Sequence, residues 1–382
     1  MKIAFISVAR HAIPPPIGII DGIASISSDL AQGLQKKGHD ITFFCPEGSS
    51  IQTKRIEIPY GSFEHLLPSH DLEQLSPVAR AELLEPLNGA LHLLLLESLK
   101  KEPFDIVHFH TSPLVFSLPF MTKIPIPKVC TLHDQFTPIY SRMVALFKTE
   151  NTAFVSISNS QRKTASEIPF TQTIYHGIDL TQFPFIKQPT DAFLFCGRIH
   201  PVKGTDIAIQ AVQATKQKLI IIGTLSLTHQ EYYRLSIQPT IDNTSIFERE
   251  VNSRSALIGQ FGQAKALLMP IQWEEPFGLV TIEAMACGTP VIAFAKGAMP
   301  EIIQDGKTGF LVNASGDDIR GDWVIKKTGI EGIQEAIERI AAMPTNDYAT
   351  LRQTCRTHTA TNFSLEKMTT AYEALYERIS QQ

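Results

Sequence analysis

The sequence contains few cysteines, and none of them forms a recognisable pair. The five cysteines, Cys45, Cys130, Cys196, Cys287 and Cys355, are odd in number and widely scattered. No two have the spacing of a metal-ligand pair or of a C-x-x-C redox motif. This pattern argues against a disulfide framework and indicates reduced thiols. We therefore expect a cytoplasmic protein.

Long apolar runs and an excess of basic residues are also absent. No apolar stretch approaches the roughly 20 residues that cross a bilayer, and Leu91–Leu99 is interrupted by His92 and Glu97. The first run, Ile3–Ala9, is too short for a secretory signal and predicts a strand instead. A formal net charge of −4 argues against nucleic-acid binding through a basic field. The same charge balance gives no indication of attachment to an anionic membrane surface, although it does not rule out peripheral contact.

Short apolar runs alternate with amphipathic segments through both halves, which predicts α/β domains with doubly wound parallel sheets. The expected strands are Ile3–Val8, Asp40–Phe44, Ile106–His108, Lys128–Leu132, Ala153–Ser156, Ala192–Phe195, Lys218–Ile222, Ala266–Met269, Pro290–Ala293 and Gly309–Leu311. We expect one domain over 1–185, completed by a C-terminal helix at 364–382, and a second over 190–360. The segment Asp179–Asp191, with Pro184 and Pro189, is the expected linker. Ligands of such folds bind at the carboxyl ends of the strands, so a cleft there is the expected site.

Two glutamates, Glu275 and Glu283, lie eight residues apart around a glycine that opens a helix. The expected strand Ala266–Met269 precedes them, Gly278 marks the helix start, and Pro290 follows its end. The first N–H groups of such a helix suit a phosphate, and two carboxylates suit the hydroxyl groups of a ribose and a sugar. A nucleotide-sugar combines these groups. The alternative is a loop residue and a helix-terminal Glu that merely stabilises the helix dipole.

Two cations follow an expected strand of the second half. Arg198 and Lys203 lie five residues apart after Gly197, and together they can offset the charge of a diphosphate leaving group. The alternative is two solvated loop cations. Asp317 and Asp318 do not form a D-x-D element, so we expect no divalent metal and no other cofactor.

The first half carries a glycine-containing loop and three histidines where strands are expected to end. The loop at 14–22 follows the first strand and includes Gly22, which allows close approach to a ligand; a plain connection is the alternative. His108, His110 and His133 follow or end neighbouring strands. Single histidines are more often packed than catalytic, and we expect a structural role for His108. His110 and His133 are candidates for the site because they face the expected cleft.

The acidic segment resembles the signature E-P-F-G-L-x-x-x-E-A-M-A-x-G-x-P-V of the retaining family 4 glycosyltransferases, which have the GT-B fold. The matching residues are Glu275, Pro276, Phe277, Gly278, Leu279, Glu283, Ala284, Met285, Ala286, Gly288, Pro290 and Val291. Gly197, Arg198, Lys203 and Gly204 are similar to the G-R-x-x-x-x-K-G element of the family. The segment Trp273–Phe294 most resembles the subgroup around the avilamycin-type glycosyltransferases.

The resemblance implies roles for these residues. Catalytic roles fall to His133, Arg198, Lys203 and Glu275, and donor binding to Gly22, His110, Arg198, Lys203, Glu275, Phe277, Gly278, Leu279, Val280 and Glu283. Glu275 would contact the donor sugar, the amides after Gly278 the diphosphate, and Glu283 the ribose. The family often carries P-P-x-x-Y-G-G-x-E in the first loop, where this chain has Ile20-Asp21-Gly22-Ile23-Ala24, and His176 stands where Asn is usual.

The function that the resemblance implies is transfer of a glycosyl group from a nucleotide-diphosphate sugar to an acceptor hydroxyl, with retained configuration and without a metal. UDP is the expected nucleotide because it is the commonest in the family. We expect attack on the same face that the phosphate leaves, with the phosphate taking the proton. Two alternatives remain: a UDP-sugar 2-epimerase of the same architecture, and a non-catalytic nucleotide-sugar-binding protein. The acceptor is not named by any motif.

Overall fold

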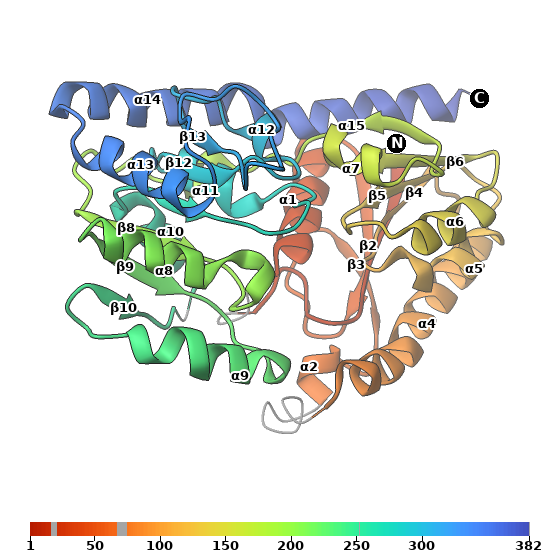
Figure 1. Cartoon of the computed structure of the whole chain (residues 1–382). Coiled ribbons are helices and arrows are strands. Elements are labelled where there is room, and N and C mark those ends of the chain that lie inside the picture. The colour runs from red at the N-terminus through yellow and green to blue at the C-terminus, as the bar shows by residue number, and fades with distance from the viewer. Residues whose placement is uncertain (17–20, 67–74, 252, 382) are drawn as a thin grey trace. The chain divides into compact units, whose positions relative to one another are not determined.

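The computed structural model describes residues 1–16, 21–66, 75–251 and 253–381. The chain forms two compact units, one of Met1–Gly177 with Leu365–Gln382 and one of Ile178–Ser364. Each unit has one parallel sheet with helices packed around it (Figure 1). The prediction of an α/β protein with two Rossmann-like sheets is confirmed.

The first unit contains a seven-stranded sheet in the order β3-β2-β1-β4-β5-β6-β7. Its strands are β1 (Lys2–Ser7), β2 (Asp40–Pro46), β3 (Lys54–Ile58), β4 (Ile106–His110), β5 (Lys128–Leu132), β6 (Thr152–Ser156) and β7 (Phe170–Thr173). Its helices are α1 (Gly22–Lys36), α2 (Phe63–Leu66), α4 (Pro77–Lys101), α5 (Leu118–Met121), α6 (Pro138–Leu146), α7 (Asn159–Thr164) and α15 (Leu365–Ser380). Strand β1 pairs with both β2 and β4, so the chain reverses its direction of winding beside β1.

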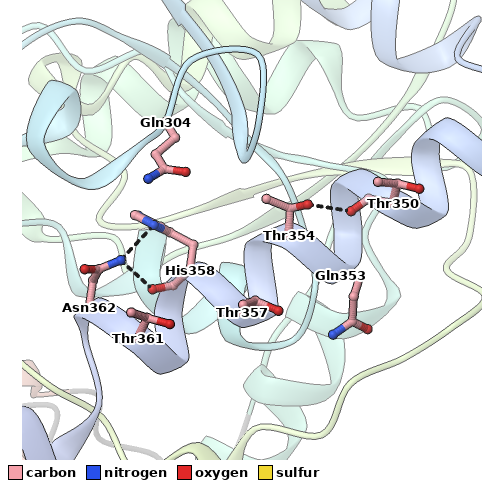
Figure 2. Close-up of a pocket in the computed structure, with 8 residues that line it drawn as sticks. All are labelled: Gln304, Thr350, Gln353, Thr354, Thr357, His358, Thr361 and Asn362. Atoms are coloured by element: carbon pink, nitrogen blue, oxygen red, sulfur yellow. Dashed lines mark hydrogen bonds between the residues drawn. The ribbon is translucent and has the colours of Figure 1, made fainter.

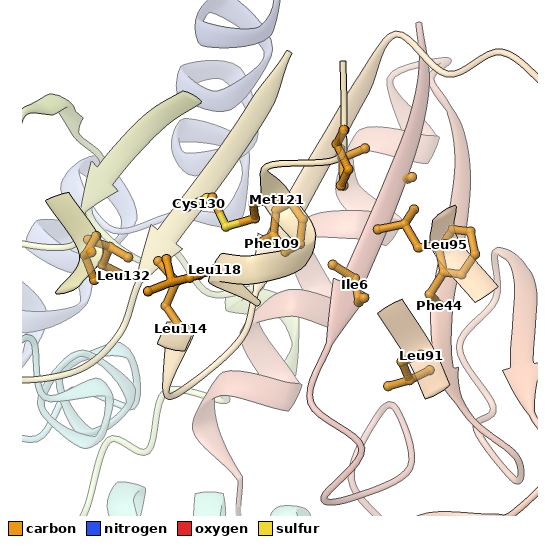
Figure 3. Packing of buried hydrophobic residues seen from close by; sticks show 14 of the residues in the cluster. Ile6, Phe44, Leu91, Leu95, Phe109, Leu114, Leu118, Met121, Cys130 and Leu132 are labelled. Atoms are coloured by element: carbon orange, nitrogen blue, oxygen red, sulfur yellow. Dashed lines mark hydrogen bonds between the residues drawn. The ribbon is translucent and has the colours of Figure 1, made fainter. Parts of the chain in front are cut away.

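Buried apolar side chains on one face of this sheet form a continuous core with α4 and the segment before β5. Figure 3 shows Ile6 of β1, Phe44 of β2 and Phe109 of β4 in this core, with Leu91 and Leu95 of α4 packed against them. All five are fully buried. Strands covered on both faces need apolar residues throughout, which explains the uninterrupted apolar runs of the sequence.

The last helix of the chain belongs to the first unit. Helix α15, at the blue end of the colour scale in Figure 1, packs on α1. Gly33 of α1 permits this approach, because a Cβ atom there would lie 2.6 Å from Cγ2 of Thr369. Tyr372 and Tyr376 of α15 are buried, and their hydroxyl groups bond to residues of β5 and β4.

The second unit contains a six-stranded sheet in the order β10-β9-β8-β11-β12-β13. Its strands are β8 (Ala192–Cys196), β9 (Lys218–Ile222), β10 (Ile246–Glu248), β11 (Leu267–Met269), β12 (Val291–Phe294) and β13 (Gly309–Val312). Its helices are α8 (Thr205–Ala214), α9 (Gln230–Tyr232), α10 (Arg254–Gln263), α11 (Leu279–Ala286), α12 (Met299–Ile302), α13 (Gly329–Ala341) and α14 (Thr345–Asn362). Strand β8 lies between β9 and β11, so the loops that follow these three strands share one edge of the sheet.

The expected linker Asp179–Asp191 belongs to the second unit, and part of it packs on that unit. Phe183 is fully buried, and its carbonyl oxygen accepts a hydrogen bond from Arg356 of α14. Arg352 of α14 donates to the carbonyl oxygen of Ile186 at 2.8 Å. The prolines lie in a segment that is largely irregular, but carbonyl groups of that segment are held by the guanidinium groups of Arg352 and Arg356.

The expected strands all form, with ends that differ by up to two residues. The sequence did not predict β3, β7 or β10, which are three of the four edge strands of the two sheets. Each of these carries polar or exposed residues on at least one face, so none reads as an apolar run. Among the described residues, no helix combines the length and apolar character that a bilayer-spanning segment needs.

Candidate functional site

The loop after β8 carries the two expected cations of the second unit. A short 3₁₀ helix, η3 (Pro201–Lys203), follows β8 and ends at Gly204, whose φ is +72°. A Cβ atom at Gly204 would lie only 2.1 Å from the carbonyl oxygen of Pro270, so this position requires glycine. The amide of Gln272 also donates to the carbonyl oxygen of Val202 at 2.7 Å. These contacts hold the loop after β8 against the loop after β11.

Lys203 and Glu275 meet across these two loops. The Lys203 Nζ atom lies 2.6 Å from Oε2 of Glu275, and the side chains are 15% and 11% exposed. Nε1 of Trp273 donates to the same oxygen at 2.8 Å, and Lys203 lies 4.8 Å from the centre of the Trp273 ring. The other carboxylate oxygen, Oε1, accepts no bond recorded from a described residue. Glu275 is therefore held at one oxygen, and the other is available to a ligand.

The backbone of Glu275 is held as tightly as its side chain. Gly297 has a φ of +57°, and a Cβ atom there would lie 2.2 Å from both N and O of Glu275. The amide of Ala298 donates to the carbonyl oxygen of Glu275 at 2.9 Å. Glycine at 297 is thus required by both its φ and this close approach.

Helix α11 begins at Gly278, directly after this acidic loop. Gly278 has a φ of +89°, and no side chain caps the helix. The amides of Leu279 and Val280 have no intrahelical acceptors at such a helix end, whereas the amide of Thr281 donates to the carbonyl oxygen of Gly278 at 2.9 Å. Leu279 and Val280, which start the helix, are half-buried. This end of α11 can therefore accept an anion.

Glu283 lies one turn further along α11 and is largely buried. Its side chain is 13% exposed, and Oε1 lies 3.3 Å from a guanidinium nitrogen of Arg254 on α10. Burial raises the pKa of the Cys196 thiol to about 12, with the charge of Glu283 as a second cause. Because Cys196 is the last residue of β8, Glu283 lies near the carboxyl end of the central strand and the loop that carries Arg198.

Arg198 and Phe277 differ in their surroundings. Arg198 is exposed and forms no recorded ion pair with a described acidic residue. Phe277 is 2% exposed, and its ring meets that of Phe363 edge-on at 6.0 Å. Arg198 can reach a ligand in solution, whereas Phe277 supports the loop from within the unit.

The neighbouring acidic residues are neutralised by basic ones. Glu274 receives two bonds from Arg320, at 2.8 and 2.7 Å. Asp318 pairs with the same arginine and with Lys296. Bonds from Arg320 and Lys296 outweigh burial and lower the pKa of Asp318. Within the described part of the chain, no group of three or more His, Cys, Asp or Glu side chains has the arrangement of a metal site.

The histidines of the first unit form a buried cluster at the ends of β4 and β5. His108 bonds to the hydroxyl groups of Tyr376 at 2.6 Å and Thr131 at 2.8 Å. The Thr131 hydroxyl in turn lies 2.7 Å from that of Tyr372. Both ring nitrogens of His108 are therefore used within the fold.

His110 and His133 contact each other through their rings. Nδ1 of His110 lies 3.2 Å from Nε2 of His133, and His133 stacks on His176 with ring centres 5.3 Å apart. Burial lowers the pKa of His133 to about 4, while the charge of Asp21 acts in the opposite direction. Burial and the neighbouring imidazoles lower the pKa values of His110 and His176 well below the ordinary value. These histidines are neutral at pH 7.

Gly22 is the first residue of α1, and Asp21 caps this helix. Oδ1 of Asp21 accepts the amides of Ile23 at 3.0 Å and Ala24 at 3.1 Å. Its other oxygen lies 3.5 Å from Nε2 of His11. Residues 17–20 of the expected glycine-containing loop lie outside the described residues.

A separate open cavity of about 450 Å³ lies on α14 of the second unit. Figure 2 shows its lining, which comes from α14 and from Gln304 in the loop after α12. The lining residues are Gln304, Thr350, Gln353, Thr354, Thr357, His358, Thr361 and Asn362. None belongs to the motifs that the sequence singled out, and the lining carries no carboxylate or lysine.

Three residues of the second-unit site were not identified from the sequence. Trp273 and Gly297 flank or contact Glu275, and Arg254 contacts Glu283. Trp273 lies within the acidic string, so its position was a usable signal. Arg254 lies in a segment without a recognisable motif, and its contact with a residue 29 positions away appears only in the fold.

Two protein families match the sequence. Residues 20–182 match the family described as "Glycosyltransferase Family 4", and residues 180–320 match "Glycosyl transferases group 1". A D-inositol 3-phosphate glycosyltransferase of Saccharomonospora viridis is 25% identical, over 98% of this chain and 93% of that protein. A protein of the same name from Mycolicibacterium smegmatis is 30% identical, over 52% of this chain and 45% of its own length.

Solved structures share the fold over nearly the whole chain. AviGT4, a glycosyltransferase involved in avilamycin A biosynthesis, has a TM-score of 0.68 at 18% identity. The alignment includes 100% of this chain and 98% of the AviGT4 chain. HepE of Anabaena, in complex with UDP and glucose, has a TM-score of 0.70 at 17% identity, with 99% and 100% of the two chains covered. Together with the matched families, these likenesses confirm the resemblance seen in the motifs. The chain belongs to the family 4 type of glycosyltransferases with the GT-B fold.

Proposed function

We propose that the second unit binds a nucleotide-diphosphate sugar and that the enzyme transfers the sugar to an acceptor hydroxyl with retention of configuration. The observation that carries this proposal is the convergence of Lys203, Glu275 and the uncapped start of α11 on one edge of one sheet. The same edge holds the exposed Arg198 and the largely buried Glu283. Cationic, amide and carboxylate groups in this proximity match the phosphates and hydroxyls of such a donor.

Each group has a distinct part in holding the donor. Arg198, Lys203 and the amides of Leu279 and Val280 bind the diphosphate, because they offer positive charge and unpaired N–H groups. The available Oε1 of Glu275 accepts a sugar hydroxyl. Gly278 allows the backbone to turn toward the phosphates.

Glu283 accepts the ribose hydroxyls in this proposal. An ionised carboxylate is an acceptor with about four lone-pair sites, and Arg254 contacts one oxygen of this one. Phe277 acts through packing that fixes the loop, since its ring is buried against Phe363.

The leaving phosphate, and not Glu275, activates the acceptor in the favoured mechanism. A nucleophilic carboxylate would need a free oxygen close to the anomeric carbon. Oε1 of Glu275 is such an oxygen, but Lys203 and Trp273 bind Oε2 and draw negative charge from the whole carboxylate, which lowers the nucleophilicity of Oε1. Same-face attack with proton transfer to the departing phosphate needs only stabilisation of that phosphate, which Arg198 and Lys203 supply without a metal.

In the first unit, we assign to His133 a contact with the donor sugar. We assign to Gly22 a close approach of the backbone to the ligand. His110 has no exposed surface, so we assign it an action through its contact with His133. A neutral imidazole at His133 can donate or accept a hydrogen bond. D-inositol 3-phosphate is the first acceptor to assay, because the relative aligned over 98% of this chain is named for it.

UDP is the first nucleotide to test, since HepE is described in complex with UDP-glucose. Isothermal titration with UDP-glucose, GDP-mannose and ADP-glucose measures donor binding, and mass spectrometry and NMR of products give the transfer and the anomer. We expect Lys203→Met to abolish turnover and weaken donor binding. Lys326→Met is the matched control, because Lys326 is 67% exposed in the same unit.

The outcomes separate the alternatives. Release of free nucleotide without an acceptor product would favour an epimerase, and tight binding without turnover a binding protein. Equal donor binding by wild type and Lys203→Met would contradict the site, and an inverted product would contradict the mechanism. Loss of turnover in EDTA that Mg²⁺ restores would contradict metal independence.

A further inference from the structure

Two histidines of the second unit, His200 and His229, contact each other near the proposed diphosphate site. Their ring centres are 3.9 Å apart, although the residues come from different loops. His200 follows β8, and His229 ends the short 3₁₀ helix η4 (Leu227–His229) after β9. No sequence motif assigned either residue a function.

Backbone pairing beyond the strands brings the two loops together. The amide of Gly197 donates to Ile222 at 3.0 Å, and that of Ile199 donates to Thr224 at 2.9 Å. A Cβ atom at Gly223 would lie 2.4 Å from the carbonyl oxygen of Gly197, so the two backbones touch. The contact between the histidines therefore rests on an ordered extension of the sheet.

The hydrogen bonds of the two rings determine whether Nδ1 of each ring can carry a proton. Nδ1 of His200 accepts the amide of Val202 at 3.0 Å, so the neutral ring carries its proton on Nε2. Protonation of His200 at Nδ1 would break this bond. Nδ1 of His229 lies 2.8 Å from the hydroxyl of Ser226 and 3.0 Å from that of Thr228. Because hydroxyl groups both donate and accept, His229 can carry a proton at this nitrogen.

The charges around this pair are positive. Burial lowers the pKa of His200, and His229, Arg198 and Lys203 lower it further. Of the acidic residues, Glu275 is bonded to Lys203 through Oε2, and the exposed Glu231 follows His229 by two residues. Without a ligand, these cations disfavour an added proton on His200. A diphosphate beside them would reverse the local field.

We propose that His200 and His229 belong to the donor site, and that a nucleotide-diphosphate sugar takes up a proton on His229 when it binds. This inference rests on the proposed function of the second unit. His200 stays neutral and presents Nε2–H, while the proton comes from solvent and no covalent bond changes. A ligand whose binding takes up a proton binds more tightly as pH falls. The total gain in affinity is up to about tenfold for each pKa unit by which the bound ligand raises the pKa of the titrating group.

Titration calorimetry with UDP-glucose tests the proton uptake directly. The diphosphate of UDP-glucose does not titrate near neutrality, whereas a terminal phosphate has a pKa of about 6 and would confuse the result. At pH 6.5, binding heats in buffers of different ionisation enthalpy give the number of protons taken up. We expect net uptake by wild type and an affinity that falls several-fold from pH 6 to pH 8.

Asparagine at the pair removes the titrating group and keeps a polar side chain. We expect His229→Asn to abolish the uptake and flatten the pH dependence of the affinity, whereas His65→Asn, at an exposed position of the first unit, keeps both. A purely structural role for His229 would weaken binding without removing the buffer dependence. Binding of UDP-glucose without proton uptake by wild type, or unchanged uptake in His229→Asn, would overturn this inference and leave the proposed function intact. No binding of UDP-glucose, GDP-mannose or ADP-glucose would overturn both.

Discussion

Removal of Lys203 and Glu275, singly and together, should reveal a strong energetic coupling. Nζ and Oε2 lie 2.6 Å apart, and the two side chains are 15% and 11% exposed. At an effective dielectric constant of about 20, the gross attraction is ~6 kcal/mol. Lost hydration costs several kcal/mol per ion and cancels much of it. We expect a net coupling of about 1–3 kcal/mol.

Each single variant should lose more than half of the free energy of unfolding that the double variant loses. Lys203→Met leaves a largely buried carboxylate with only the N–H of Trp273. Glu275→Gln leaves the ammonium group without a charged partner, with a neutral amide and the Trp273 ring, 4.8 Å away, as its neighbours. Each should lower the free energy of unfolding by roughly 2–3 kcal/mol, because one charge loses its partner. The double variant should lose little more than either single one.

Tryptophan fluorescence in a urea titration is a suitable assay, since it reports on the second unit alone. The chain has two tryptophans, Trp273 and Trp323, and both lie in that unit. The matched control is the exposed pair Lys326–Asp322, 67% and 93% exposed, which should show no measurable coupling. Additive effects of Lys203→Met and Glu275→Gln would refute the reasoning, because they would mean that the two groups do not interact.

Three further predictions concern stability and binding. The first unit should lose stability as pH falls from 6.5 toward 4. The pKa of His133 is about 4 in the fold, so in this pH range the unfolded chain binds more protons than the folded one, and the free energy of unfolding falls by roughly 3 kcal/mol. His176→Asn should make this loss smaller, because it removes a second imidazole whose pKa burial lowers well below the ordinary value; circular dichroism in urea measures the loss, and an unchanged pH profile would contradict this prediction. Arg352→Met should lower the urea midpoint of the second unit by an amount equivalent to about 3 kcal/mol, because this buried guanidinium bonds to Ile186, Gly262 and Cys287 carbonyls; a shift no larger than that of an exposed arginine would contradict it. Gly297→Ala should weaken UDP-glucose binding in calorimetry at least about tenfold, since strain of about 1–2 kcal/mol falls on Glu275, whereas Gly316→Ala, with nothing within 4 Å, should bind normally; equal affinities would show that Glu275 need not be fixed.

The central strands could be predicted because burial on both faces requires apolar runs. Strands β5 and β9 have the expected bounds, whereas β3, with the sequence KRIEI at the sheet edge, carries the charges that an exposed strand tolerates. The 25-residue helix α4 was also missed. Leu84, Leu87, Leu91 and Leu95 are buried in the core, whereas Leu83 and Leu93 are exposed. With Pro86 inside the helix, the apolar residues do not follow one helical stripe.

The motifs located the site residues but not their mutual contacts. Lys203 and Glu275 are 72 residues apart, so their ion pair depends on the register of β8 and β11. The histidine cluster illustrates the same limit: the sequence gives His110 and His133 similar positions after strands. Only the fold shows that His110 is fully buried and bonded to His133.

A crystal structure of the protein with UDP-glucose would test the central claim most directly. The account predicts the diphosphate at the start of α11 within bonding distance of Arg198 and Lys203, with Glu275 on the sugar and Glu283 on the ribose. A nucleotide found elsewhere, such as in the threonine-lined cavity on α14, or a diphosphate out of reach of both cations, would contradict it.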